Sequence, residues 1–286
     1  QIKTMTRGEL DVAIAWAAAE SWNPGLHDAD CFYGANPTGF LMGFLNNEPI
    51  ASISAVKYGE SFGFIGFYIV KPGFRGQGYG LAIWQAALDY LKGRNVGLDG
   101  VVAQQDNYIK SGFRLAHRNI RYEGVGNGKS SDSGCVSLAK VSTTALIEYD
   151  RRFFPEERSN FIQCWSTQPG SHGVGLLQEQ TLVGYGVLRP SHSGYKIGPL
   201  FADTATIAEQ VFQALAAKVP VGSAYYLDVP EVNGAAVALA ERLGMDYGFE
   251  TARMYTKKDP GLPLDKIFGI TTFELGLCEC LRTLQY

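Results

Sequence analysis

The sequence predicts an α/β fold made of two related domains, each with a mixed sheet flanked by helices. An apolar strand at residues 63–70 leads through a glycine-rich turn into residues 81–92, where Leu81, Trp84, Leu88 and Leu91 follow helical spacing. Two segments, 39–54 and 173–187, have the pattern of hairpins. Motifs also recur at a near-constant offset of 132 residues, as from Ile65 to Ile197. Such a repeat indicates a duplicated domain.

The first half, which we place at residues 1–134, begins with an alanine-rich helix at 9–20 that ends at Asn23-Pro24-Gly25. The elements that follow are a loop or short helix at 30–37, the hairpin at 39–54, a turn at 57–61, the central strand and its helix, a turn at 97–100, a short strand at 101–103, a helix carrying Tyr108, and a strand at 113–122.

Residues 123–134 are rich in glycine, serine and charge, so we expect a surface loop or linker there. The second half, 135–286, is predicted to contain a strand at 135–141, helices at 145–154, 155–165 and 206–218, a strand at 223–229, and a last strand at 267–273 that matches 135–141. The sequence leaves open whether these two terminal strands close their own sheets or exchange.

The turn after the central strand reads Arg75-Gly76-Gln77-Gly78-Tyr79-Gly80. Glycines at alternate positions let backbone N–H groups approach an anion, and the helix N-terminus and Arg75 add positive charge. The turn therefore predicts a pyrophosphate site. A dinucleotide fingerprint fits poorly because its third glycine position is Ile83, and the P-loop-like stretch 124–130 is one residue short and follows no apolar strand.

The stretch resembles the coenzyme-A-binding motif Arg-x-x-Gly-x-Gly of the GCN5-related N-acetyltransferases (GNAT), with Val70, Arg75, Gly76, Gln77, Gly78 and Gly80 on the motif positions. The resemblance implies two domains that each have a central, mostly antiparallel sheet. It implies acetyl-CoA as the cofactor, with the pyrophosphate on residues 75–80, Tyr79 included, and the pantetheine along Tyr68, Ile69 and Val70. It also implies that this strand splays away from the next one.

A second stretch, Tyr108-x-x-x-Gly112-Phe113, is similar to a later element of the same family. The resemblance implies that Tyr108 is the acid that protonates the departing thiolate. The alternative is an aromatic side chain on a packed helix face. Many relatives carry an asparagine seven residues before this tyrosine; this chain has Val101 there, whereas the second copy has Asn233 at the equivalent place.

The second copy lacks the chemical groups of the first. At the repeat offset, Arg75, Gly76, Gln77, Gly78 and Gly80 correspond to Ile207, Ala208, Glu209, Gln210 and Phe212, and Tyr108 corresponds to Ala240. We therefore expect the second half to be a degenerate domain that supports the structure and shapes the substrate site.

Acceptor-site candidates come from residues 21–28, which in the family border the acceptor pocket. Trp22, Asn23 and Asp28 are the candidates there; a capped loop is the equal alternative. Direct attack needs a neutral amine, and deprotonating an alkylamine at pH 7 costs about 4.6 kcal/mol. The central strand 64–70 holds no carboxylate, so the predicted bases are Glu20 and Asp28, followed by His117.

Composition sets the remaining expectations. A net charge of −3 and a pI near 5.9 argue against nucleic acid as a partner. The longest apolar run, 12–19, is too short to span a membrane, and no signal peptide is apparent. Five scattered cysteines predict reduced thiols and a cytoplasmic location. We expect no metal site, because Cys278-x-Cys280 has no second ligand pair.

The function predicted from the sequence is an acyl-CoA-dependent N-acetyltransferase that moves an acetyl group to the amine of a small molecule by direct attack. The protein would act as a monomer or homodimer. Two alternatives remain open: a non-catalytic acyl-CoA sensor, and an N-acetyltransferase for proteins or peptides.

Overall fold

The computed structural model describes residues 1–130 and 133–275. The elements of the first half are β1 (Ile2–Thr4), α1 (Arg7–Ala19), α2 (Asp28–Ala35), β2 (Phe40–Leu45), β3 (Glu48–Tyr58), β4 (Phe62–Val70), α3 (Tyr79–Tyr90), β5 (Asn95–Val101), α4 (Gln105–Lys110) and β6 (Arg114–Val125). Short 3₁₀ turns lie at Pro72–Phe74 and Val102–Gln104.

The second half has the same order of helices and strands from β8 to β12 as the first half has from β2 to β6. Its elements are β7 (Val136–Ser137), α5 (Thr143–Asp150), α6 (Ser159–Trp165), β8 (His172–Gln178), β9 (Thr181–Pro190), β10 (Tyr195–Ala202), α7 (Ala205–Ala216), β11 (Ala224–Pro230), α8 (Gly234–Arg242), β12 (Asp246–Tyr255) and β13 (Ile267–Gly269), with 3₁₀ turns at Leu138–Lys140, Arg151–Phe153 and Leu264–Lys266.

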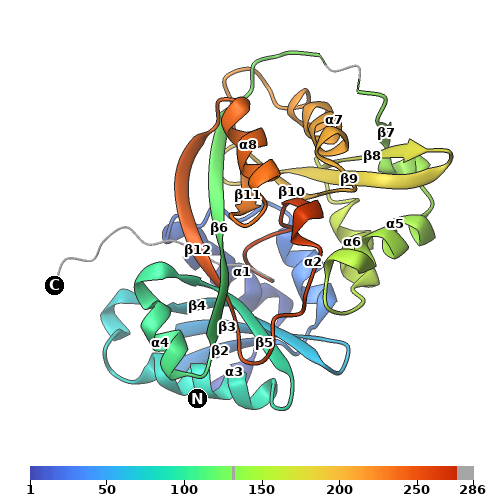
Figure 1. Ribbon diagram of the computed structural model, residues 1–286. Helices are drawn as coiled ribbons and strands as arrows, with labels where there is room; N and C mark the ends of the chain where they lie inside the picture. Colours follow the sequence, from blue (N-terminus) through green and yellow to red (C-terminus); the bar gives the residue numbers. More distant parts are fainter. Residues whose placement is uncertain (131–132, 276–286) are drawn as a thin grey trace.

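The two halves share one continuous sheet, because each contributes a long strand to the other. The strand order is β1-β2-β3-β4-β5-β12-β6-β11-β10-β9-β8-β7. Strand β12 pairs with β5 on one side and with β6 on the other, and β6 in turn pairs with β11. Figure 1 shows β6 and β12 running side by side from one half into the other. The exchange therefore involves these strands; β7 and β13 pair within the second half.

Both predicted hairpins are confirmed. Asn46 and Asn47 join β2 to β3, and Glu179 and Gln180 join β8 to β9; all four have positive φ. Two such residues form the turn whose twist matches paired strands. The shared turn geometry supports the duplication.

The predicted turn at 97–100 is wrong, because these residues belong to β5. The two glycines of this segment leave room for aromatic side chains that pack against β5. A Cβ at Gly97 would lie 2.8 Å from the Phe64 ring, and one at Gly100 would lie 2.2 Å from the Tyr108 ring. The strand predicted at 101–103 is likewise wrong beyond Val101, since Val102–Gln104 is a 3₁₀ turn. In the second half only Val136–Ser137 of the strand predicted at 135–141 forms, and the helix predicted at 155–165 begins at Ser159.

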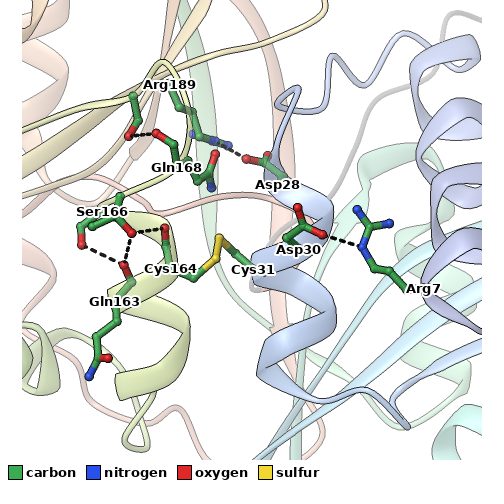
Figure 2. Close-up of a disulfide and its surroundings, with 11 residues drawn as sticks. Arg7, Asp28, Asp30, Cys31, Gln163, Cys164, Ser166, Gln168 and Arg189 are labelled. Carbon is green, nitrogen blue, oxygen red and sulfur yellow. Dashed lines mark hydrogen bonds and ion pairs between the residues drawn. A yellow bond between two sulfur atoms is a disulfide. The ribbon is translucent and has the colours of Figure 1, made fainter.

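The expectation of reduced thiols is wrong for two cysteines. Cys31 in α2 and Cys164 in α6 form a disulfide between the halves (Figure 2). Sequence spacing could not reveal the pair, because the two helices meet only in the folded protein. Cys135 is free, whereas Cys278 and Cys280 lie outside the described residues.

Within residues 1–130 and 133–275, every helix is too short or too polar to cross a membrane. The same ranges contain no group of three His, Cys, Asp or Glu side chains placed to hold a metal ion.

Candidate active site

A pocket opens where β4 and β5 separate. The two strands pair in parallel only from Phe62 opposite Asn95 to Ile65 opposite Leu98. Beyond that point lies what we call the splay pocket, which is lined by Trp22, Gly66, Tyr68, Trp84, Asp99 and Tyr108, among others. The expected splay is therefore present in the first half.

A bulge in β4 aims the backbone into this pocket. The register against β3 shifts between Ser52 and Ser54, and Phe67 adopts φ +46°. Lys71 N–H donates to Ile50 O over 2.9 Å, which makes these two residues a hydrogen-bonded pair. In an antiparallel ladder the neighbouring pair, Val70 and Ala51, is then non-hydrogen-bonded. The N–H of Val70 consequently points away from β3, toward the splay.

The turn after β4, for which the sequence predicts a pyrophosphate cradle, leads directly into α3. Gly76 and Gly78 have φ of +73° and +85°, a region in which residues with a Cβ are strained, and Gly78 is the N-cap of α3. A Cβ at Gly80 would lie 2.6 Å from the Tyr68 hydroxyl oxygen. Gly76 and Gly78 are exposed, so the backbone that leads into α3 is open to an anion.

Arg75 has partners within the protein. Its Nε donates to Val70 O over 2.7 Å, and its guanidinium forms an ion pair with Glu20. Glu20 is the C-cap of α1, so this contact joins the end of α1 to the end of β4. Glu20 therefore lies beside the cradle and is engaged there. The other cradle side chains make local contacts: Gln77 Nε2 donates to Gly73 O, and the Tyr79 ring lies 6.2 Å from the Phe74 ring.

Aromatic side chains form the pocket wall on the α3 side. The Trp84 ring lies 5.6 Å from that of Tyr108 and 5.2 Å from that of Tyr68. Burial raises the pKa of Tyr68. The indole N–H groups of Trp22 and Trp84 are buried and lack a hydrogen-bond partner among the described residues. Both line the pocket, so each can donate to a bound ligand.

Of the three residues predicted from the 21–28 loop, only Trp22 lines the pocket. Asn23 exchanges two hydrogen bonds with the backbone of Ser193, of 2.9 and 2.7 Å. Asp28 is 0% exposed and accepts from Gly25 N and from Arg189 Nε, the latter over 2.9 Å (Figure 2). Asn23 and Asp28 therefore hold the loop against the second half.

The structure places a carboxylate in the pocket that sequence reasoning missed. Asp99 is 1% exposed and projects from β5. Its Oδ1 accepts from Asn119 over 2.8 Å, and its Oδ2 accepts from Arg253 over 2.9 and 2.6 Å. Burial raises the pKa of this carboxyl, while Arg253 and Asn119 oppose that shift. Had residues 97–100 been assigned to a strand, alternation would have put Asp99 on the face opposite Leu98.

His117, the last predicted base, lies on β6 and is 5% exposed. Burial, with the charge of Arg253, lowers its pKa to about 3. The imidazole is therefore neutral near pH 7. Its Nδ1 is buried without a hydrogen-bond partner among the described residues.

Comparison with known proteins places this geometry in a family. Residues 10–110 match the model of the acetyltransferase (GNAT) family, and residues 146–269 match that of an acetyltransferase (GNAT) domain. The holothin acyltransferase of Pseudoalteromonas sp. (strain SANK 73390) is 32% identical over 269 residues, covering 94% of this chain and 92% of that protein. The chain belongs to the GNAT family. It is an N-acetyltransferase with two GNAT domains in tandem.

Solved structures show the same fold. A Pyrococcus horikoshii protein provisionally classed as an acetyltransferase superposes with a TM-score of 0.83 at 22% identity, covering 96% of this chain and 95% of that one. A tandem GNAT protein from the clavulanic acid biosynthesis pathway gives a TM-score of 0.62 at 12% identity, covering 91% and 99%.

In the second GNAT domain the corresponding gap is filled by the chain itself. Strands β10 and β11 pair in parallel from Tyr195 opposite Tyr225 to Ile197 opposite Leu227. Beyond that point β13 pairs with β10, and Ile270 N–H donates to Asp228 O of β11 over 2.9 Å. Asn233, at the place where many relatives carry an asparagine, donates to Ile267 O over 3.0 Å. A strand thus occupies the place where a pantetheine would run.

After β13 the chain returns to the splay pocket of the first GNAT domain. We call residues 270–275 the strap. A Cβ at Gly66 would lie 2.2 Å from Glu274 O, and the Tyr58 hydroxyl donates to Leu275 O over 3.1 Å. Lys196 Nζ lies 3.6 Å from Glu274 Oε1. The strap therefore covers β4 on the side away from α3.

Proposed function

We propose that this GNAT protein transfers the acetyl group of acetyl-CoA to the amine of a small molecule, by direct attack within a ternary complex. The observation that carries the proposal is the contrast between the halves: the first has an open splay and a glycine cradle, and the second has neither. Residues 1–134 would form the catalytic domain, completed by β12, and residues 135–286 a degenerate, substrate-shaping domain. A cytoplasmic location stays a prediction.

Acetyl-CoA supplies an acyl group activated as a thioester. The N–H groups of residues 76–80 and of the first turn of α3 would hold the pyrophosphate, while Tyr68, Ile69 and Val70 would border the pantetheine. Arg75 would position the cradle through its bonds to Val70 O and Glu20 and add positive charge beside it. The N–H of Val70 is aimed to stabilise the developing oxyanion, worth about 3 kcal/mol.

Two titratable groups of the splay pocket would move the protons. As the amine nitrogen bonds to the thioester carbon, Asp99 would accept the proton that the nitrogen loses. As the carbon–sulfur bond breaks, Tyr108 would donate its proton to the thiolate. The products are an amide and the free thiol of CoA. In this assignment Asp99 replaces Glu20 as the base, since Asp99 lines the splay pocket whereas Glu20 lies beside the cradle.

Two observations support a small acceptor. The related protein is named for acyl transfer to holothin. The strap and the Ser193 turn of the second half also cover the acceptor side of β4 and the 21–28 loop. A protein terminus would have to displace these segments to reach the splay pocket.

The test measures thiol release from acetyl-CoA with holothin and a panel of simple amines. We expect release above background with at least one amine. Tight acetyl-CoA binding with no release from any amine would instead favour the sensor function.

Matched variants test where the cofactor binds. Gly78→Gln introduces the residue of the second copy at a positive φ, which costs about 1–2 kcal/mol. Calorimetry should show acetyl-CoA binding at least tenfold weaker, whereas Gln210→Ala, at the equivalent place in the second half, should bind like the parent. Equal affinities for all three proteins would contradict a cradle in the first half.

A further inference from the structure

The two strands that cross between the halves, β6 and β12, each bring an arginine to the sheet of the other half (Figure 1). Arg253 on β12 lies directly opposite Asp99 on β5, and Arg121 on β6 lies directly opposite Asp228 on β11. Each arginine forms an ion pair with the facing aspartate, and the four side chains are at most 11% exposed. The arginines are separated by the repeat offset of 132 residues. The protein therefore contains two copies of one interdomain aspartate–arginine pair.

The two copies differ in how the guanidinium meets the carboxylate. Arg121 donates one hydrogen bond to each oxygen of Asp228, from Nε to Oδ1 and from Nη2 to Oδ2, both over 2.7 Å. Arg253 donates from Nε and Nη2 to a single oxygen of Asp99, Oδ2, over 2.9 and 2.6 Å. The pair in the second half thus engages both carboxylate oxygens, whereas the pair in the first half engages one.

This difference leaves an accepting position on Asp99. Each oxygen of a carboxylate can accept about two hydrogen bonds, so the two bonds from Arg253 fill Oδ2. From the described residues, Oδ1 accepts one bond, which Asn119 Nδ2 donates over 2.8 Å. Asp99 lines the splay pocket, so the carboxylate with an open position is the one in the candidate active site.

Contacts on two further sides hold the Arg253 guanidinium in this orientation. Its Nη1 donates to the Tyr255 hydroxyl over 3.3 Å, and its central carbon lies 5.4 Å from the centre of the Phe64 ring. These contacts restrict rotation of the guanidinium toward the forked arrangement of the second half. Oδ1 of Asp99 therefore stays available.

We infer that Arg253 is a positioning residue for the transfer reaction: it holds Asp99 by Oδ2, so that Oδ1 is the atom that takes the proton of the attacking amine. The inference rests on the proposed function, in which Asp99 is the base. As the carbon–nitrogen bond forms, the proton moves from the amine nitrogen to Oδ1, which leaves a neutral carboxyl beside Arg253. The second domain thus supplies a group on which the chemistry of the first depends.

Arg253 also favours the charged form of Asp99. Burial raises the pKa of the Asp99 carboxyl, as does the like charge of Asp228, whereas Arg253 and Asn119 lower it. The other titratable side chains around this carboxylate are Tyr68, Tyr108, His117 and Tyr255. The imidazole among them is neutral near pH 7, because burial lowers its pKa to about 3. A neighbouring arginine typically lowers the pKa of an aspartate by about 1–3 pH units, so its removal should raise the pKa.

The experiment titrates the Asp99 carboxyl by carbon-13 NMR of protein labelled at the aspartate carboxyls, with the signal assigned by its loss in Asp99→Asn. Arg253→Gln keeps an N–H donor but removes the charge, and it should raise the pKa of this carboxyl by about one pH unit or more. Arg253→Lys keeps the charge and should stay within about half a pH unit of the parent. The same small change is expected for Arg121→Gln, the matched control in the second copy.

Thiol release from acetyl-CoA, with holothin or whichever amine of the panel is turned over, gives the functional readout. Activity falls as the pH drops through the pKa of the base, so the acid limb of kcat should move to higher pH in Arg253→Gln by the amount seen in the NMR titration. It should stay in place in Arg121→Gln. The acceptor is the same for all proteins, so its own titration cancels. Arg253→Lys should lower kcat at least about tenfold, because an ammonium cannot make the paired donation of a guanidinium.

The outcomes separate this inference from the proposed function. If the carboxyl titrates as expected but no amine releases thiol, the proposed reaction fails and the control of Asp99 by Arg253 stands. The inference is overturned if Arg253→Gln leaves the pKa of the carboxyl unchanged, or if the carboxyl shifts and the acid limb of kcat does not. Should Arg253→Gln fail to fold, Arg253→Lys decides, since parental kcat in that variant would show that the paired donation is dispensable.

Discussion

Replacement of Asp99 by asparagine tests the proposed chemistry most directly. The change keeps the shape of the side chain and removes its charge, so the amide cannot accept the proton of the amine. Loss of a positioned base typically lowers the rate about 10²- to 10⁴-fold. We therefore expect kcat to fall at least roughly 100-fold, while the Kd for acetyl-CoA changes less than threefold, because Asp99 lies outside the cradle.

The same substitution also has a structural cost, because it leaves the buried Arg253 guanidinium without its carboxylate. Breaking a buried ion pair costs about 3–5 kcal/mol. Asp228→Asn is the matched control: Asp228 is 6% exposed, bonds Arg121 through two contacts of 2.7 Å, and does not line the splay pocket. Both variants should lose comparable stability in urea denaturation, whereas only Asp99→Asn should lose kcat.

The acceptor pKa provides an independent readout. An alkylamine must lose a proton at pH 7, whereas an arylamine is already neutral. The defect of Asp99→Asn should therefore be larger at low pH and smaller with an arylamine. A folded Asp99→Asn protein that keeps more than half of the parental kcat would refute the assignment, as would an equal loss of kcat in Asp228→Asn.

Three further predictions follow from the described contacts. Tyr108→Phe keeps the ring between Gly100 and Trp84, so acetyl-CoA affinity should hold within about twofold while kcat falls roughly 100-fold; parental kcat would show that another group protonates the thiolate. Cys31→Ala removes a disulfide between residues 133 positions apart, which stabilises the fold by about 5 kcal/mol in the chain-entropy account. Urea denaturation should show a lower free energy of unfolding for the variant, and dithiothreitol should lower that of the parent by the same amount. A free energy of unfolding that neither change affects would disprove the disulfide. The folded protein holds the pKa of His117 near 3, so only the unfolded chain takes up a proton at this residue as the pH falls below about 6.5. The free energy of unfolding should therefore decline toward pH 3 by up to about 1.4 kcal/mol per pH unit. His117→Phe should flatten this decline; if the variant keeps the parental slope, other groups cause the decline.

Much of this site could be predicted from local motifs in the sequence. The cradle depends on glycines whose positive φ is a property of single residues, and the hairpins depend on two-residue turns. The repeat is recognised from a constant offset between matching residues of the two copies. Each of these features involves residues close together in the chain or matched between copies, so spacing and residue type were enough to predict a duplicated α/β domain and a glycine-rich turn before a helix. The resemblance of that turn to the GNAT motif supplied the family.

Only the tertiary structure decided which residues line the splay pocket. Asp99 entered the site when Gly97 and Gly100 proved to be packing positions in β5 rather than turn residues. The pairing of β12 with β5 brought Arg253 beside it, and β13 closed the second gap with backbone that a residue pattern cannot assign. The Cys31–Cys164 bridge likewise depends on the packing of α2 against α6. The Asp99–Arg253 and Cys31–Cys164 contacts join residues 154 and 133 positions apart. Their partners are determined by how whole strands and helices pack, which no local pattern specifies.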